Sequence, residues 1–288
     1  MNVLHGTKYP ALDTLFAHEQ QQCWPYQIHA DSLEASELDE CARYPIDKPF
    51  AWVKADVNQD GKLDLLVNYG GGYKSFYCFL NQGQLKPIEV EILGRKRDYC
   101  RSCKLVKVAG QPAIAILEIA PAGYHKEAQV WQDTLVYRLG AFVEYNAHPG
   151  RKYPQKIVLR TDQPSLTEMG WRRTWAINLR SGWVSINPLM EPLPRLKYPG
   201  AYPERYRLGR GVLDTLRQQL AYLNVKKLKS EYYYAGAVKA RLTLTYAHQP
   251  EKKIEDKGAR GMYGLYAIYS LITAAYERIE QRIANNKP

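Results

Sequence analysis

The nine residues Asp56-Val57-Asn58-Gln59-Asp60-Gly61-Lys62-Leu63-Asp64 decide how the first half of the chain is expected to fold. They place carboxylate or carboxamide side chains at positions 1, 3, 5 and 9 of a short loop, with a glycine at position 6. Hard cations such as Ca²⁺ take about six to eight oxygen ligands, and a curled loop of this composition supplies such oxygens. Gly61 permits the sharp turn, and Lys62 can offer its carbonyl oxygen. A loop of this kind organises a fold rather than performing chemistry.

The residues on either side of the loop favour β-strands. Segments 50–55 and 65–69 are rich in β-branched and aromatic residues, which suit a pleated surface. An EF-hand instead has a helix on each side and needs a bidentate acid at position 12, which is Val67 here. The sequence therefore predicts a strand, a cation loop and a second strand.

Residues 56–69 resemble the calcium-loop hairpins of FG-GAP and integrin-type propeller repeats, which share the pattern Asp-x-Asp/Asn-x-Asp-Gly-x-x-Asp-Leu. Those families repeat the pattern blade after blade, whereas one copy is found here, which argues against a full propeller. The alternative is an ordinary solvated turn, because Asp, Asn and Gly favour turns in any case. The resemblance implies one structural Ca²⁺ ion, with ligands from Asp56, Asn58, Asp60 and Asp64 and from the carbonyl group of Lys62.

Charge divides the chain unevenly. Residues 1–148 carry 15 Lys and Arg against 18 Asp and Glu, a net charge of −3, whereas residues 149–288 carry 25 against 11, a net charge of +14. A basic half of this size suggests an acidic partner, which can be a protein surface, a nucleic acid or an anionic membrane surface. The cations are scattered in pairs rather than in one block, so they can also serve solubility alone.

Composition is that of a soluble globular protein, with 45% hydrophobic and 24% charged residues among 288. No apolar run approaches the length of a membrane span, so membrane insertion is not expected. The first residues lack a basic region followed by an apolar stretch, which favours the cytoplasm, or the periplasm if a signal was removed. Cys100 and Cys103 form the one close cysteine pair, and we interpret them as reduced residues of a surface turn rather than a metal or redox site.

The pattern of elements predicts an α+β fold in two domains. Residues 1–148 are expected to hold short helices at 8–20 and 31–42, followed by an antiparallel β-meander. Residues 155–288 are expected to form a small, basic two-layer α+β domain that ends in a long helix. The expected strands of the meander are 50–55, 64–69, 75–80, 85–92, 103–108, 112–119, 129–138 and 141–145. In the second domain we expect strands at 156–161, 172–179, 182–187 and 241–246, a proline-rich stretch at 188–203, a charged turn leading into 253–258, and helices at 209–223 and 261–284.

Residues 155–284 also resemble an uncharacterised bacterial domain family. The segments that carry the resemblance are 172–178, 242–246 and 253–265. The resemblance implies a strand pair, a helix, a second strand pair and a closing helix, arranged as a small α+β layer. The family has no established activity, so this likeness bears on the fold alone.

No Gly-x-Ser-x-Gly elbow, Walker loop, dinucleotide-binding glycine motif or His-Glu-x-x-His helix is present in the sequence. The best candidates for a catalytic role are His125, beside Tyr124 and Glu127, and Asp133. We therefore expect a non-enzymatic binding protein with a structural Ca²⁺ loop, such as an inhibitor or immunity-type protein that recognises another protein. Tyr69 and Tyr73, which flank a glycine-rich turn, could touch such a ligand.

Two alternatives remain open. The first is nucleic-acid binding by the basic half, because lysines next to tyrosines can neutralise phosphates and stack on bases. The second is an uncharacterised hydrolase or transferase. The residues that best fit the first alternative are Lys226, Lys227, Lys229, Tyr232, Tyr233 and Tyr234.

Overall fold

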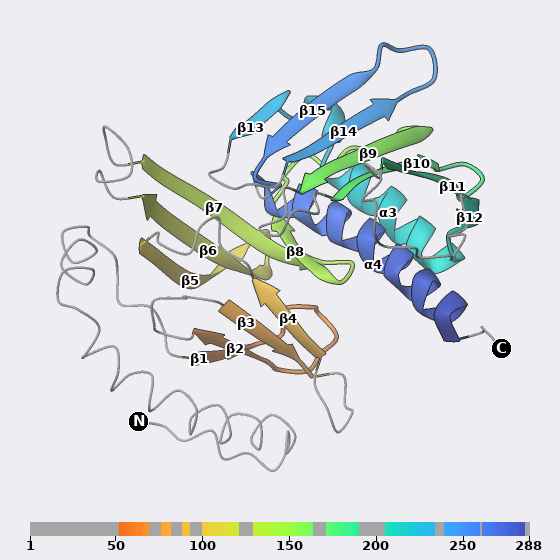
Figure 1. Cartoon of the computed structure of the whole chain (residues 1–288). Helices are drawn as coiled ribbons and strands as arrows, with labels where there is room; N and C mark the ends of the chain where they lie inside the picture. Colours follow the sequence, from red (N-terminus) through yellow and green to blue (C-terminus); the bar gives the residue numbers. More distant parts are fainter. Residues whose placement is uncertain are drawn as a thin grey trace, which may run out of the picture. The chain divides into compact units, whose positions relative to one another are not determined.

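The computed structural model describes residues 52–68, 76–81, 88–92, 100–120, 129–163, 171–189, 205–233, 239–259 and 261–285. The chain divides into two compact units, Met1–Tyr145 and Asn146–Pro288 (Figure 1). The described elements are mostly β-strands with two α-helices, which confirms the broad α+β prediction. The short helices expected at 8–20 and 31–42 lie outside the described residues.

Unit 1 contains two four-stranded antiparallel sheets, each with its strands in sequence order. Sequence order means that every strand pairs with its neighbour along the chain. Ala109 and Gly110 have φ angles of 49° and 81°, and Leu139 and Gly140 have φ angles of 52° and 90°. Two consecutive residues with positive φ suit the tight hairpin turns that join right-twisted strands. The first sheet comprises β1 (Trp52–Ala55), β2 (Asp64–Asn68), β3 (Phe76–Leu80) and β4 (Ile88–Ile92), and the second comprises β5 (Cys100–Val108), β6 (Gln111–Ala120), β7 (Gln129–Arg138) and β8 (Ala141–Glu144).

Unit 2 is built on one seven-stranded sheet with the strand order β12-β11-β10-β9-β14-β15-β13. All neighbouring strands are antiparallel except β13 and β15, which run parallel. The strands are β9 (Lys156–Gln163), β10 (Trp171–Asn178), β11 (Trp183–Leu189), β12 (Arg205–Arg207), β13 (Glu231–Tyr233), β14 (Lys239–Thr245) and β15 (Lys252–Lys257), and the helices are α3 (Arg210–Tyr222), the short 3₁₀ helix η1 (Val225–Lys227) and α4 (Tyr263–Asn285).

The core of unit 2 lies between one face of this sheet and the two α-helices (Figure 1). Leu159, Trp175 and Leu242 from the sheet are almost fully buried, as are the helix residues Leu216 and Leu265. Aromatic rings fill the remaining space, because large rings bury much apolar area. The Trp175–Tyr276 and Tyr206–Tyr276 pairs each have ring centroids 6.3 Å apart.

No helix in the described part of the chain is both long enough and apolar enough to cross a membrane.

Candidate cation-binding loop

Asp56 organises the loop that joins β1 to β2. Its Oδ1 accepts the backbone N–H of Asp60 at 3.0 Å, and its Oδ2 accepts the N–H of Gly61 at 3.0 Å. Gln59 and Gly61 have φ angles of 62° and 84°, a backbone conformation that Gly adopts without steric cost. These two residues let the chain curl tightly enough for the carboxylate of Asp56 to accept hydrogen bonds from two backbone N–H groups.

Asn58 and Asp60 continue the curl. The Oδ1 of Asn58 accepts the N–H of Asp60 at 3.1 Å, and the Oδ1 of Asp60 accepts the N–H of Lys62 at 2.9 Å. The side-chain amide of Asn58 also donates to Oδ2 of Asp60 at 3.0 Å. The side chains of Asp56, Asn58 and Asp60 are therefore gathered around the same short run of backbone.

Asp64 is fully buried at the base of the loop. Its Oδ2 accepts the N–H of Val57 at 2.9 Å, and its Oδ1 accepts the N–H of Asn81 at 2.8 Å. Burial is the largest influence on this group and raises the pKa of the carboxyl to about 6; the nearby charge of Asp60 adds to the rise, while the backbone hydrogen bonds oppose it. Asp64 thus ties the loop to the end of β3.

The oxygen donors of the loop suit a hard cation. A carboxylate or carbonyl oxygen that accepts one N–H keeps a second lone pair for a further contact. Among the residues that the structure describes, however, no group of three or more His, Cys, Asp or Glu side chains is arranged to hold a metal ion. The ligand set Asp56, Asn58, Asp60, Lys62 and Asp64 stays a prediction.

The second sheet of unit 1 contacts the same loop. Gln59 Nε2 donates to Gln111 Oε1 at 2.6 Å, at the start of β6. On β7, burial, with smaller contributions from Cys78 and Asp64, raises the pKa of Tyr137 to about 12. Tyr137 therefore lies within electrostatic range of the loop base, so both sheets of unit 1 help to fix its position.

The cysteines described in unit 1 behave as core residues. Cys78 and Cys103 are buried and do not form disulfides. Burial is the main cause that raises the pKa of the Cys78 thiol well above its ordinary value. Cys100 and Cys103 both belong to strand β5 and not to a turn, so the predicted surface turn is wrong. A thiol that is buried and protonated is a weak nucleophile and metal ligand.

The lysines predicted for nucleic-acid contact lie in one short segment of unit 2, in or just after η1. Lys226 and Lys227 are exposed on η1, and Lys229 follows them. Tyr232 is half-buried: its hydroxyl oxygen accepts the N–H of Lys229 at 3.3 Å, and its Cβ lies beside Gly261. Tyr232 therefore has less ring surface available for stacking than the sequence suggested.

Most of the other candidates lie outside the described residues. They are Tyr69, Tyr73, Tyr124, His125, Glu127 and Tyr234. Tyr233 is described only as part of strand β13. Asp133 is half-buried in β7, where it pairs with Ile116 of β6.

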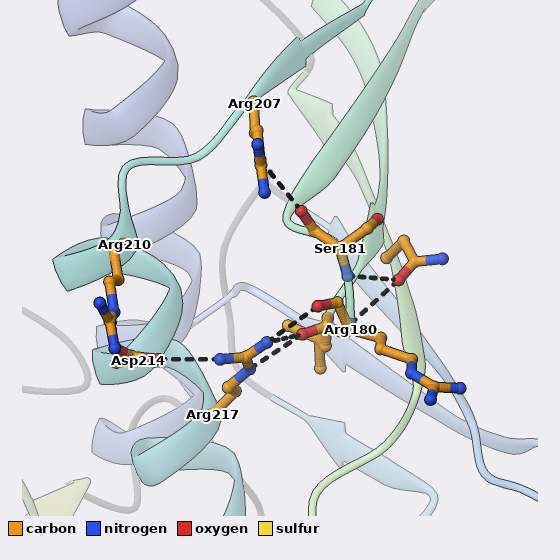
Figure 2. Close-up of polar contacts among 8 residues, drawn as sticks. Arg180, Ser181, Arg207, Arg210, Asp214 and Arg217 are labelled. Carbon is orange, nitrogen blue, oxygen red and sulfur yellow. Dashed lines mark hydrogen bonds and ion pairs between the residues drawn. The ribbon is translucent and has the colours of Figure 1, made fainter.

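Arg217 forms a polar cluster that sequence reasoning missed (Figure 2). Its guanidinium donates to the carbonyl oxygen of Leu179 at 2.8 and 2.6 Å and to that of Arg180 at 3.1 Å. It also donates to Asp214 at 2.8 Å. These bonds fix the β10–β11 turn to helix α3, which gives Arg217 a structural role. In the sequence, the sole signal was its spacing of three residues from Asp214.

No protein-family model matches the chain. No curated protein and no solved structure matches it either. The resemblance of residues 56–69 to FG-GAP hairpins, and that of residues 155–284 to a bacterial domain family, therefore stay predictions. The functional proposals below rest on the geometry of the described residues.

Proposed function

We propose that the chain is a non-enzymatic binding protein in which one Ca²⁺ ion braces the hairpin of β1 and β2. The observation that supports this most directly is the arrangement of Asp56, Asn58 and Asp60, whose side-chain oxygens surround the backbone of one curled loop. Lys62 adds its carbonyl oxygen at position 7 of the same loop.

Electrostatics supports a bound cation at this loop. Asp56 and Asp60 carry like charges and are held close, since the N–H of Asp60 donates to Asp56. A divalent cation would neutralise their repulsion. Because the loop is curled only in the folded state, the ion would also stabilise folding, by about 2.7 kcal/mol at about a hundred times its dissociation constant.

The braced hairpin would serve association. Loops that are already rigid lose less conformational entropy when a partner binds, so more of the contact energy is expressed as affinity. We propose a protein partner with an acidic surface, because residues 149–288 carry a net charge of +14. The specific role that we propose is an inhibitor or immunity-type protein that blocks a toxin.

The experiment compares capture of partners from a host lysate in Ca²⁺ and in chelator. Full-length protein should retain a partner in Ca²⁺ only, and Asp60→Asn should abolish retention because it removes one negative charge from the loop. Glu251→Gln, an exposed acid of unit 2, should retain the partner as the unchanged protein does. The captured partner should lose its own activity when the purified protein is added. The proposal would be contradicted if the partner were retained equally in chelator and by Asp60→Asn, or if the partner's activity did not change.

A further inference from the structure

The seven-stranded sheet of unit 2 has one face covered by helices and one face that the described helices leave open (Figure 1). Burial alternates along its strands: in β14, Ala240, Leu242 and Leu244 are buried, whereas Lys239 and Arg241 are exposed. Since successive side chains of a strand point to opposite faces, the buried set faces α3 and α4. The exposed set forms the second face, which we call the open sheet face.

The open sheet face is strongly basic. The strands β9, β12, β14 and β15 each place two Lys or Arg residues on it, giving eight cations, and the strand register places three carboxylates there, those of Asp162, Glu231 and Glu255. The net charge of these described side chains is +5. A surface with this imbalance attracts a polyanion through its long-range field.

Like charges lie directly opposite one another on this face. Arg160 of β9 pairs in register with Arg241 of β14. Lys239 of β14 pairs with Lys257 of β15 on one side and with Asp162 of β9 on the other. Opposed like charges destabilise a sheet. Each arginine has one carboxylate nearby, with Arg160–Asp162 at 3.1 Å and Arg241–Glu255 at 3.5 Å, but both ion pairs are partly exposed and therefore weak. A row of bound phosphates would relieve the remaining repulsion.

One edge of the open sheet face carries an exposed tryptophan. Trp183 of β11 is 40% exposed, although large aromatic side chains are usually buried. The guanidinium of Arg205 lies 4.7 Å from the centroid of its ring, and Arg207 is its partner in register on β12. An exposed ring beside two arginines can stack on a base while the guanidiniums contact the adjoining phosphates.

The centre of the face is made mostly of small side chains. Thr174 and Ala176 of β10 lie between Ser185 of β11 and the β9 strand, and Thr243 lies on the far side of β9. Small residues keep bulky groups from blocking the surface, and the hydroxyls can donate to phosphate oxygens. An extended chain could therefore cross the strands from the Trp183 edge to the cations of β14 and β15.

We propose that the open sheet face of unit 2 binds single-stranded nucleic acid, with Trp183 as the stacking residue. The major groove of B-form DNA admits a helix or a two-stranded ribbon, whereas single strands can lie across a wide sheet and stack on its aromatics. The surface differs from the Lys226–Tyr232 segment indicated by the sequence, and it does not depend on the calcium proposal. On this face an acidic protein or phosphopeptide is the competing occupant, and the test distinguishes it from a nucleic acid.

The test is fluorescence anisotropy of full-length protein with labelled oligo(dT) and oligo(U) of about 12 nucleotides. We expect binding that weakens as salt rises, with a log–log slope of about −0.7 for each phosphate contacted. Trp183→Ala should weaken binding by about 5- to 150-fold, the range measured for loss of one stacked base. Arg205→Glu should weaken binding and make the slope shallower by about 0.7.

Lys226→Glu is the matched control, since it makes the same change of charge on η1 and not on the sheet. Circular dichroism and the melting temperature check that each variant folds. The proposal is overturned if Trp183→Ala binds as the unchanged protein does, or if Lys226→Glu weakens binding as much as Arg205→Glu. It is also overturned if an acidic peptide or phosphopeptide of equal charge competes as well as unlabelled oligo(dT), because the base would then contribute nothing.

Discussion

The carboxylate of Asp64 accepts the backbone N–H of Asn81 at 2.8 Å, so the base of the loop is bonded to a residue 17 positions further along the chain. The same carboxylate accepts the N–H of Val57. One buried acid therefore joins three parts of unit 1: the loop, strand β2 and the end of β3. This bond explains how the loop is held in place whether or not a cation is bound.

Asp64→Ala should destabilise the protein by about 2 to 6 kcal/mol. It leaves two buried N–H groups without an acceptor, and each such group costs about 1 to 3 kcal/mol. Asp64→Asn keeps one acceptor oxygen, so its stability should lie between that of the unchanged protein and that of Asp64→Ala. The midpoint of urea unfolding measures both changes, and an Asp64→Ala protein as stable as the unchanged one would show that these two bonds contribute nothing.

Gly261→Ala should destabilise unit 2 by about 1 to 3 kcal/mol, the usual cost of overpacking. A Cβ at this position would lie 2.3 Å from Cβ of Tyr232 and 3.0 Å from Oδ1 of Asp256, which itself accepts the N–H of Gly261. Gly211→Ala is the control, because nothing lies within 4 Å of the Cβ that the alanine would add and because Ala is the better helix former. In thermal unfolding Gly211→Ala should leave the melting temperature unchanged or raise it. Equal effects of the two substitutions would contradict the packing described around Gly261.

Arg217→Ala should cost about 1 to 3 kcal/mol, since it removes the donors that join Leu179 and Arg180 to helix α3. Arg217→Lys should recover part of the loss. Arg210→Ala is the matched control, because Arg210 is 96% exposed and lies 3.8 Å from Asp214. It should change the free energy of unfolding, measured in urea, by less than about 0.5 kcal/mol. If Arg210→Ala costs as much as Arg217→Ala, the contacts to the β10–β11 turn are not what stabilises this region.

Stability should fall at alkaline pH because unit 2 buries tyrosine hydroxyls. Burial raises the pKa of Tyr206 to about 12 and that of Tyr269 well above its ordinary value. The unfolded chain releases these protons near pH 10, where the folded protein retains them, so the free energy of unfolding decreases as pH rises from about 10 to 12. Phenolate absorbance should show at least three phenols fewer titrating near pH 10 than in the unfolded chain, those of Tyr137, Tyr206 and Tyr269. Titration of all tyrosines together near pH 10 in the folded protein would contradict this burial.

Local signals in the sequence predicted many elements correctly. The Ala109–Gly110 and Leu139–Gly140 turns were predictable because glycine accepts the positive φ that a tight hairpin requires. Helix α4 was predictable from its apolar spacing, which the burial of Tyr269 and Tyr276 explains. The segment of strand β15 was expected to follow a charged turn, and only the family resemblance implied a strand there, since Ile254 is its sole apolar residue and its other buried residue is Asp256.

Long-range pairing could not be predicted from the sequence. Strands β9 and β14 are neighbours although about 80 residues separate them, and their pairing creates the Arg160–Arg241 contact on the open sheet face. Strands β12 and β13 are three residues long, which is too short for an alternating pattern to be recognised. The exposure of Trp183 depends on which face the helices cover, a property of the tertiary fold alone.

The most direct test of the calcium proposal is a calorimetric titration of chelator-treated, full-length protein with Ca²⁺, repeated with Asp60→Ala. We predict binding at one site, with that site lost in Asp60→Ala. Asp60 lies at position 5 of the loop, and its carboxylate already accepts the backbone N–H of Lys62. Absence of binding by the unchanged protein, or binding that survives in Asp60→Ala, would contradict the claim that the Asp56–Asp64 loop is a cation site.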